Sequence, residues 1–405
     1  MKEPNDTQDK VQANLCLIGD AGGAHVRRRV RALADAGASV DLLTPRASGL
    51  CHHVNINETV VTDDGGNDIY ASWSRAIAAS GAPLVNIHYA SSHGAWTFAL
   101  SGDSRPMILN VMGGDVLFDE QSNPHAIARH LTGNVLRRAD RVTVKSAFLG
   151  TAACNAGARS DAIERLFWGI DRDVFRPGSK PQARLDMGLP AQGSIVFSAR
   201  PLRPFYRIDV ILEALAEIRN AGKDIHLVVS GYEAEPRYLS MLKARATELD
   251  LTERVIFRPP MTGKDMVAMY QAADISVGIP PSDGFPQTVL EAMACDCVNV
   301  MSPLARYREF VADDESAVFV APTAEALAIE LVRLFDDPSR RQRIIAGGRS
   351  VIDRLPTLAA SASRMLDIAR TLPAKTAASR PAWPTKLFGR AVLVSLARRH
   401  RQQGV

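Results

Sequence analysis

The sequence predicts an α/β protein with a doubly wound parallel sheet in each of two halves, and three observations support this. Short apolar runs alternate with amphipathic helical patterns along most of the chain. Many of these runs are apolar throughout, as is typical of parallel strands covered by helices on both faces. The length of 405 residues exceeds what a single hydrophobic core usually supports.

The composition is that of a globular protein, with 46% hydrophobic and 23% charged residues. A net charge of +4 indicates no nucleic-acid partner, although it suits a positive site for a nucleotide diphosphate. Five cysteines are scattered in apolar surroundings, so we expect no disulfide framework and a reducing cytoplasm. The polar residues 1–12 are expected to be disordered, and no window approaches a transmembrane span.

The first predicted unit is a strand over 13–18, a helix over 25–36 and a strand over 40–43. The loop between the first strand and the helix contains Gly22 and Gly23 but lacks the spaced glycines of a dinucleotide site. A phosphate-binding loop explains these glycines about as well as a loop that only lets the helix pack closely on the strand.

Two later strands of the first half end in titratable residues. One is expected over 83–87, before His88, and the next over 107–111, shortly before Asp115. Side chains at the carboxyl ends of parallel strands often contact ligands. His88 and Asp115 are therefore candidate site residues.

The second half begins with a strand over 194–198 and then three arginines within eight residues, Arg200, Arg203 and Arg207. Arginine at a strand end suits phosphate, because the guanidinium group donates hydrogen bonds in a fixed geometry. A loop of solvated arginines is the alternative. Further strands are expected at 225–229, which precedes Gly231, and at 255–257, 275–279, 298–300 and 317–320. Helices are expected at 209–219, 238–248, 264–273, 323–335 and 339–354.

The stretch over 281–294 follows a buried strand and opens a helix. Gly284 suits a tight turn there, and Pro286 suits the first helical position. Gln287 and Thr288 would then offer free backbone N–H groups to a phosphate.

Two carboxylates accompany this helix start, Asp283 just before it and Glu291 inside it. Carboxylates accept hydrogen bonds from hydroxyl groups, so the stretch indicates a phosphorylated, hydroxyl-rich ligand. An ordinary turn residue and a helix-surface charge are the alternative for the two acids.

The same stretch resembles the signature of retaining GT-B glycosyltransferases of family four, E-G-F-G-x-x-x-x-E-A-M-A-x-G. An acid stands at both ends here, while Asp283 replaces the first Glu, Pro286 a Gly and Asp296 the last Gly. The resemblance implies that Glu291 holds the ribose of a nucleotide and that Asp283 meets the donor sugar.

Three other segments resemble family motifs. Residues 139–146 match A-D-x-v-x-x-x-S, and residues 166–177 match N-G-V-D-x-x-x-F-x-P, with Trp168 in place of Asn. In the motif G-R-L-x-x-x-K-G, whose basic residues grip the donor diphosphate, Arg200 matches the Arg and Tyr206 falls on the Lys.

The resemblance implies a GT-B fold, with two Rossmann-like doubly wound parallel-sheet domains facing across a cleft. The expected limits are an acceptor domain over 13–176, a hinge over 177–190 and a nucleotide-sugar domain over 191–355, followed by C-terminal helices and a basic tail over 356–405. Candidate catalytic residues are Asp283, Glu291, Arg200, His88 and Asp115. Candidate donor-binding residues are Arg203, Arg207, Gly231, Phe285, Pro286, Gln287, Thr288, Gly22 and Gly23.

The implied activity is transfer of a sugar, with retention, from a nucleotide-sugar to a glycan or lipid-linked acceptor. No cofactor or metal is expected, since arginine charge can replace a metal. Residues 386–401 form a basic amphipathic pattern, which would suit contact with the inner face of a membrane; a helix packed on the body or a frayed end is the more common case for such a pattern. A non-catalytic binding protein of the same fold and a sugar-nucleotide epimerase are the alternatives.

Overall fold

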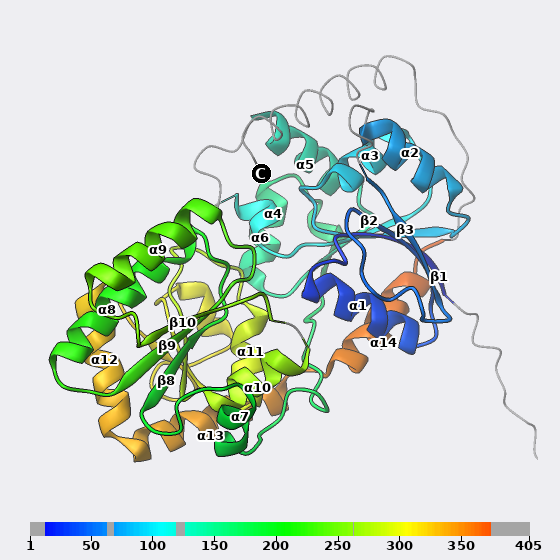
Figure 1. Ribbon diagram of the computed structural model, residues 1–405. Coiled ribbons are helices and arrows are strands. Elements are labelled where there is room, and N and C mark those ends of the chain that lie inside the picture. Colours follow the sequence, from blue (N-terminus) through cyan, green and yellow to red (C-terminus); the bar gives the residue numbers. More distant parts are fainter. Residues whose placement is uncertain (1–12, 63–68, 119–125, 262, 374–405) are drawn as a thin grey trace, which may run out of the picture. The chain divides into compact units, whose positions relative to one another are not determined.

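The structure is a computed structural model and describes residues 13–62, 69–118, 126–261 and 263–373 (Figure 1). The described chain divides into two compact units. Unit 1 contains the residues up to Trp168 and those from Leu358 onward, and unit 2 contains Gly169–Thr357. The predicted disordered segment 1–12 and the predicted basic helix 386–401 lie outside the described residues.

Unit 1 is built on a parallel sheet of seven strands in the order β3-β2-β1-β4-β5-β6-β7. The strands are β1 (Asn14–Ile18), β2 (Ser39–Thr44), β3 (Ile56–Val60), β4 (Leu84–His88), β5 (Met107–Asn110), β6 (Arg141–Val144) and β7 (Ile163–Arg165). The order reverses between β1 and β4, which is where open α/β sheets bind ligands beyond the carboxyl ends of their strands.

Helices cover both faces of this sheet. They are α1 (Ala24–Asp35), α2 (Ile69–Ala79), α3 (His93–Ser101), α4 (Gly114–Leu117), α5 (Ala126–Arg138), α6 (Ala147–Asn155) and α14 (Leu358–Arg370). Cys16 and Ile18 of β1 face a core shared with α2, α3, α5 and α6. Leu15 and Leu17 face the other core, with α1 and α14. This alternation follows from the two-residue period of a strand and explains why β1 is apolar at nearly every position.

Unit 2 has a parallel sheet of six strands in the order β10-β9-β8-β11-β12-β13. The strands are β8 (Ser194–Ser198), β9 (Ile225–Ser230), β10 (Val255–Arg258), β11 (Ile275–Gly278), β12 (Val298–Met301) and β13 (Val318–Phe319). The helices are α7 (Lys180–Asp186), α8 (Ile208–Asn220), α9 (Pro236–Glu248), α10 (Lys264–Ala272), α11 (Gln287–Ala294), α12 (Ala324–Asp336) and α13 (Pro338–Arg354). The order reverses between β8 and β11.

Opposite faces of this second sheet also have separate cores. Val196 of β8 packs in a core with α8, α9 and α12. The next residue, Phe197, points to the other face and contacts Tyr270 of α10, with ring centroids 5.3 Å apart. Two doubly wound parallel sheets are therefore present, as the sequence predicts.

The chain links the two units twice, at residues 168–169 and 357–358. Gly169 belongs to unit 2, where a Cβ added to it would lie 1.7 Å from the carbonyl oxygen of Pro356. Only glycine permits this close approach of two backbone segments.

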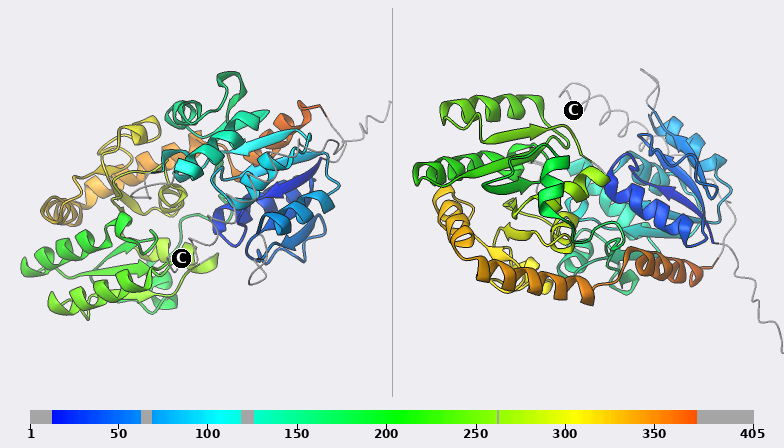
Figure 2. Two further views of the ribbon diagram at one scale, coloured as in Figure 1. Left: turned by 90° about the horizontal axis from the view of Figure 1, so that it is seen from above. Right: turned by 60° about the horizontal axis from the view of Figure 1, so that its bottom comes forward.

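Two features go beyond the sequence-based domain limits. Helix α14 returns to unit 1 and packs against α1, as both figures of the fold show (Figures 1 and 2). Helix α7 occupies part of the predicted hinge over 177–190 and packs against α10 inside unit 2. Among the described residues, no helix is both long enough and apolar enough to cross a membrane.

Candidate functional site

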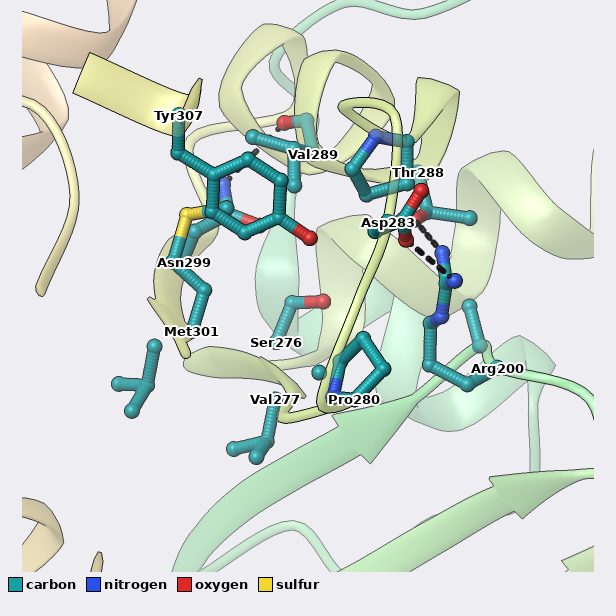
Figure 3. Close-up of a pocket in the computed structure, with 14 residues that line it drawn as sticks. Arg200, Ser276, Val277, Pro280, Asp283, Thr288, Val289, Asn299, Met301 and Tyr307 are labelled. Carbon is teal, nitrogen blue, oxygen red and sulfur yellow. Dashed lines mark hydrogen bonds and ion pairs between the residues drawn. The ribbon is translucent and has the colours of Figure 1, made fainter. Parts of the chain in front are cut away.

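An ion pair joins the ends of β8 and β11 in unit 2. Nη2 of Arg200 lies 2.6 Å from Oδ2 of Asp283, and Nη1 lies 3.5 Å from the Thr288 hydroxyl (Figure 3). The side chains of Arg200 and Asp283 are only 11% and 15% exposed, so water screens the pair weakly. The structure thus brings together three of the residues that the sequence singled out.

The left-handed residue in the turn between β11 and α11 is Phe285. Its φ is 84°, whereas Gly284, which the sequence assigned to this turn, is not among the residues with positive φ. A left-handed conformation costs a residue other than glycine about 1–3 kcal/mol. Buried packing compensates, because the Phe285 ring stacks on Phe310 with centroids 4.4 Å apart.

Helix α11 begins one residue later than predicted. Pro286 has φ −77° and ψ 146° and is the residue before the helix, so Gln287 is the first helical residue. No side chain caps this helix start. The side chain of Gln287 donates to the carbonyl oxygen of Gly169 at 3.0 Å. The helix N-terminus keeps the partial positive charge that favours an anion.

Glu291 is 3% exposed on the buried side of α11. Burial first, and then the charge of Glu291, raises the pKa of the neighbouring Cys295 thiol to about 12. The carboxyl group therefore lies inside the unit and not on a helix surface, which argues against the alternative of a simple surface charge. Its contact with a ribose stays a prediction.

The loop after β8 shows how the missing lysine is replaced. Tyr206 is 5% exposed, and the guanidinium of Arg200 lies over its ring, 4.6 Å from the centroid. Tyr206 therefore positions the one cation of the motif by a cation–π contact instead of adding a second cation.

The other two arginines of this loop are placed differently. Arg203 pairs with Glu233 at 2.8 Å, on the outer part of the loop. Arg207 has a φ of 54° and precedes α8. Close packing requires a glycine at position 231, since an added Cβ would lie 2.6 Å from the carbonyl oxygen of Arg258.

A pocket opens beside the Arg200–Asp283 pair (Figure 3). Besides Arg200, Asp283 and Thr288, its polar lining residues are Ser276, Asn299 and Tyr307. Burial, followed by the charge of Asp283, raises the pKa of the Tyr307 phenol, which therefore stays protonated and can donate a hydrogen bond. Sequence reasoning missed these three residues, because each reads as an ordinary member of a buried strand or a short helix.

In unit 1, Asp115 is fully buried and joins two strand ends. Its carboxylate accepts hydrogen bonds from the backbone N–H groups of Ala90, Met112 and Gly113 at 2.9, 3.1 and 2.9 Å. Burial raises its pKa, and these hydrogen bonds oppose the rise. Asp115 thus fixes the loops after β4 and β5, and a direct catalytic role stays a prediction.

His88 ends β4 and is fully buried. Its Nδ1 lies 3.4 Å from Nη1 of Arg29, and the Arg29 guanidinium lies over the Trp168 ring, 5.0 Å from its centroid. Sequence reasoning missed Arg29, because it is one of several arginines in the helical stretch of α1.

The two candidate glycines lie at the start of α1. Gly23 is the residue before the helix, and no side chain caps it. A Cβ on Gly22 would lie 2.7 Å from Cβ of Arg46, whose side chain pairs with Asp20. The structure supports the close-packing explanation of Gly22, and phosphate binding by this loop stays a prediction.

Solved structures show the class of fold to which this arrangement belongs. Sucrose-phosphate synthase from Thermosynechococcus elongatus is 21% identical, with a TM-score of 0.77 over 89% of this chain and 99% of that chain. HepE from Anabaena, in complex with UDP-glucose, is 16% identical, with a TM-score of 0.77 over 89% of this chain and 100% of that chain. The fold is that of the GT-B glycosyltransferases.

Sequence comparison identifies the family. Residues 179–351 match the family model Glycosyl transferases group 1, and residues 14–146 match Glycosyl transferase 4-like. The second half of the chain therefore carries a domain of the group 1 glycosyl transferases, and the first half a glycosyl transferase 4-like domain.

Curated relatives carry the name D-inositol 3-phosphate glycosyltransferase. The one from Saccharomonospora viridis is 34% identical over 210 residues, which are 49% of this chain and 47% of that protein. The chain therefore spans about half the length of that relative. The one from Catenulispora acidiphila is 27% identical over 366 residues, or 81% of this chain and 86% of that protein.

Proposed function

We propose that this protein is a retaining glycosyltransferase that moves a sugar from a nucleotide-sugar to a hydroxyl group of a glycan or lipid-linked acceptor. The observation that carries the proposal is the meeting of Arg200, Asp283 and Thr288 at the start of α11. It combines a cation and a helix N-terminus for the diphosphate with a carboxylate for sugar hydroxyl groups.

Arg200 and Asp283 form an ion pair with each other, in which Nη2 and Oδ2 are 2.6 Å apart. A diphosphate would compete for the guanidinium, which donates well to phosphate oxygens. Asp283 would then turn to a sugar hydroxyl as its new hydrogen-bond donor. Diphosphate and sugar are thus recognised together, and each replaces one half of the resting ion pair.

In the proposed reaction the bond between the anomeric carbon and the diphosphate oxygen breaks. The bond to the acceptor oxygen forms on the same face, and the acceptor proton passes to the leaving diphosphate. Arg200 and the N–H groups of α11 stabilise the negative charge of the leaving group. We also propose that the reaction needs no metal ion, because these groups supply the positive charge.

The first test measures thermal stabilisation of the purified chain by UDP-, GDP- and ADP-sugars, since ligand binding to the native state raises Tm. UDP-glucose heads the panel because HepE binds it. We expect one nucleotide class to shift Tm, and both Arg200→Ala and Glu291→Ala to lose the shift. Arg245→Ala is the control, because Arg245 of α9 makes exposed ion pairs, at 2.7 Å to Glu213 of α8 and at 3.0 Å to Glu248. A folded protein that responds to no nucleotide-sugar would contradict the proposal.

Consumption of the nucleotide-sugar distinguishes a transferase from an epimerase and from a non-catalytic binding protein. The donor that shifts Tm is incubated with and without acceptors, among them inositol phosphate, which the names of the relatives suggest. Donor consumption only with acceptor, unaffected by EDTA, is expected. Consumption without acceptor would indicate an epimerase, and binding without any consumption a non-catalytic protein.

We further propose that the acceptor is met at the cytoplasmic face of a membrane, reached through the basic segment 386–401. The full chain and a chain ending before this segment are compared for sedimentation with anionic vesicles. Equal sedimentation of the two chains would remove this part of the proposal.

A further inference from the structure

A second cation of the molecule, Arg29 in unit 1, contacts a candidate site residue and not a carboxylate. Its Nη1 lies 3.4 Å from Nδ1 of His88, at the end of β4, where the strand order reverses between β1 and β4. The hydrogen-bonding groups of arginine and histidine determine which nitrogen of His88 carries the hydrogen.

A guanidinium group has five N–H donors and no acceptor. In the contact with His88, Arg29 must therefore donate, and Nδ1 must accept with a lone pair. A neutral imidazole that accepts at Nδ1 carries its hydrogen on Nε2. The neighbouring cation also disfavours protonation of Nδ1, which would place two positive charges together.

Arg29 is itself held in place from two sides. Its guanidinium lies 5.0 Å from the centroid of the Trp168 ring. The Trp168 indole is fixed by donation to Oδ1 of Asn110 at 3.4 Å. Burial lowers the pKa of Arg29 to about 9, and the charge of Asp115 opposes this fall, so Arg29 remains a cation at neutral pH.

The indole at position 168 thus has a physical role, since a smaller residue there would not cover the guanidinium. Trp168 stands where the motif noted in the sequence usually has Asn. The residue that departs from the motif, Trp168, thus contacts the same guanidinium that contacts His88.

We infer that Arg29 is a positioning residue, which fixes His88 as the Nε2–H tautomer so that His88 offers one hydrogen-bond donor, and no base, to a ligand oxygen. Nε2 of His88 is buried and has no hydrogen-bond partner among the described residues. A buried donor without a partner is unfavourable, so a ligand that brings a hydroxyl or phosphate oxygen to Nε2 is favoured. The inference rests on the proposed function only in taking that oxygen to belong to a sugar-bearing substrate.

The electrostatic surroundings support an uncharged His88. Burial first, and then the charge of Arg29, lowers its pKa well below the usual value. Asp115, the other charged group that acts on Arg29, is occupied by three backbone N–H groups. His88 therefore stays neutral through the physiological range and has no proton to give as an acid from Nδ1.

The test is the ¹⁵N spectrum of imidazole-labelled full-length protein, with the His88 signals assigned as those missing from His88→Gln. In the wild-type protein we expect the pattern of a single Nε2–H tautomer, unchanged between about pH 8 and pH 6. An Nδ1–H tautomer, or an imidazolium that titrates in this range, would overturn the inference without any Arg29 variant.

Arg29→Met removes the donor but keeps a long side chain. We expect mixed tautomers of His88 and a raised pKa in this variant, because the nearby positive charge is gone. Arg31→Met is the matched control, since Arg31 lies on the same helix and only pairs with Asp35 on the surface. A His88 spectrum that Arg29→Met leaves unchanged would overturn the inference. No turnover is needed, so this result is independent of whether glycosyl transfer is detected.

Discussion

The two units place a cation at the same topological position and use it in different ways. In unit 2, Arg200 lies where the strand order reverses between β8 and β11 and pairs with the carboxylate of Asp283, which we propose that a diphosphate displaces. In unit 1, Arg29 contacts the imidazole of His88 where the strand order reverses between β1 and β4.

The carboxylates of the two sites, Asp283 and Asp115, also have different hydrogen-bond partners. Asp283 uses one oxygen for Arg200 and the other for the N–H of Gly284 next to it. Asp115 accepts three backbone N–H groups from two loops. The carboxyl edge of a doubly wound sheet can therefore carry an ion pair when the carboxylate binds a cation, as Asp283 does. When the carboxylate binds only backbone N–H groups, as Asp115 does, the same edge can carry a neutral hydrogen-bond donor such as His88.

The largest expected effect is on activity, in Arg200→Ala. This variant removes the cation that pairs with Asp283 and contacts Thr288, so we expect kcat/KM to fall about 10²–10³-fold, as for the loss of a group that stabilises a leaving anion. Steady-state kinetics with the donor found by thermal shift measure it. A fall below tenfold would mean that Arg200 is not the main diphosphate contact.

The next effect compares the two acids by stability. Asp115→Asn places an amide group against three backbone donors, so we expect it to lower the free energy of unfolding by about 2–3 kcal/mol. Asp283→Asn keeps an acceptor for Gly284 but leaves the guanidinium of Arg200, which is 11% exposed, without its carboxylate, so we expect a loss of about 3–5 kcal/mol. A bound nucleotide diphosphate should restore part of this loss and none of the loss in Asp115→Asn. Urea unfolding of both variants with and without the nucleotide measures the difference, and an equal response of the two variants would remove the distinction between a structural and a ligand-binding acid.

The third expected effect is a pH dependence of the free energy of unfolding that comes from His88 in unit 1. The pKa of His88 is lowered in the folded state, so its contribution to stability is present above the unfolded pKa of about 6.5 and is lost as pH falls toward the folded value. Stability should fall by about 1.4 kcal/mol per pH unit below about pH 6.5 from this residue alone. Denaturant midpoints across this range should show a shallower slope in His88→Gln. The same slope in both proteins would contradict a neutral, buried His88.

The smallest effect concerns a departure from the family motif in unit 2. Asp296 has a φ of 60°, where the motif has glycine, and it pairs with the half-exposed side chain of Arg349. Asp296→Gly relieves the left-handed backbone but loses an exposed ion pair, so we expect unfolding to change by less than about 1 kcal/mol. Donor binding should be unchanged. A loss of binding would extend the site beyond the start of α11.

Local patterns determined much of this protein. The strand predicted over 194–198 is β8 itself, and the helix predicted over 264–273 is α10 with one residue fewer. The sequence also placed Arg200 and Asp283 each after a predicted parallel strand, and the carboxyl ends of such strands share one edge of the sheet. Such features depend on periodicity and strand polarity, which neighbouring residues encode.

The tertiary structure alone decided the rest. Packing on Phe310 holds Phe285 in a left-handed conformation, although Gly284 is the residue that would adopt it most easily. Helix α14 packs against α1, and Arg29 contacts His88, 59 residues away in the chain. These choices depend on which side chains meet across long separations in sequence, and a one-dimensional pattern of apolar and polar residues does not contain that information.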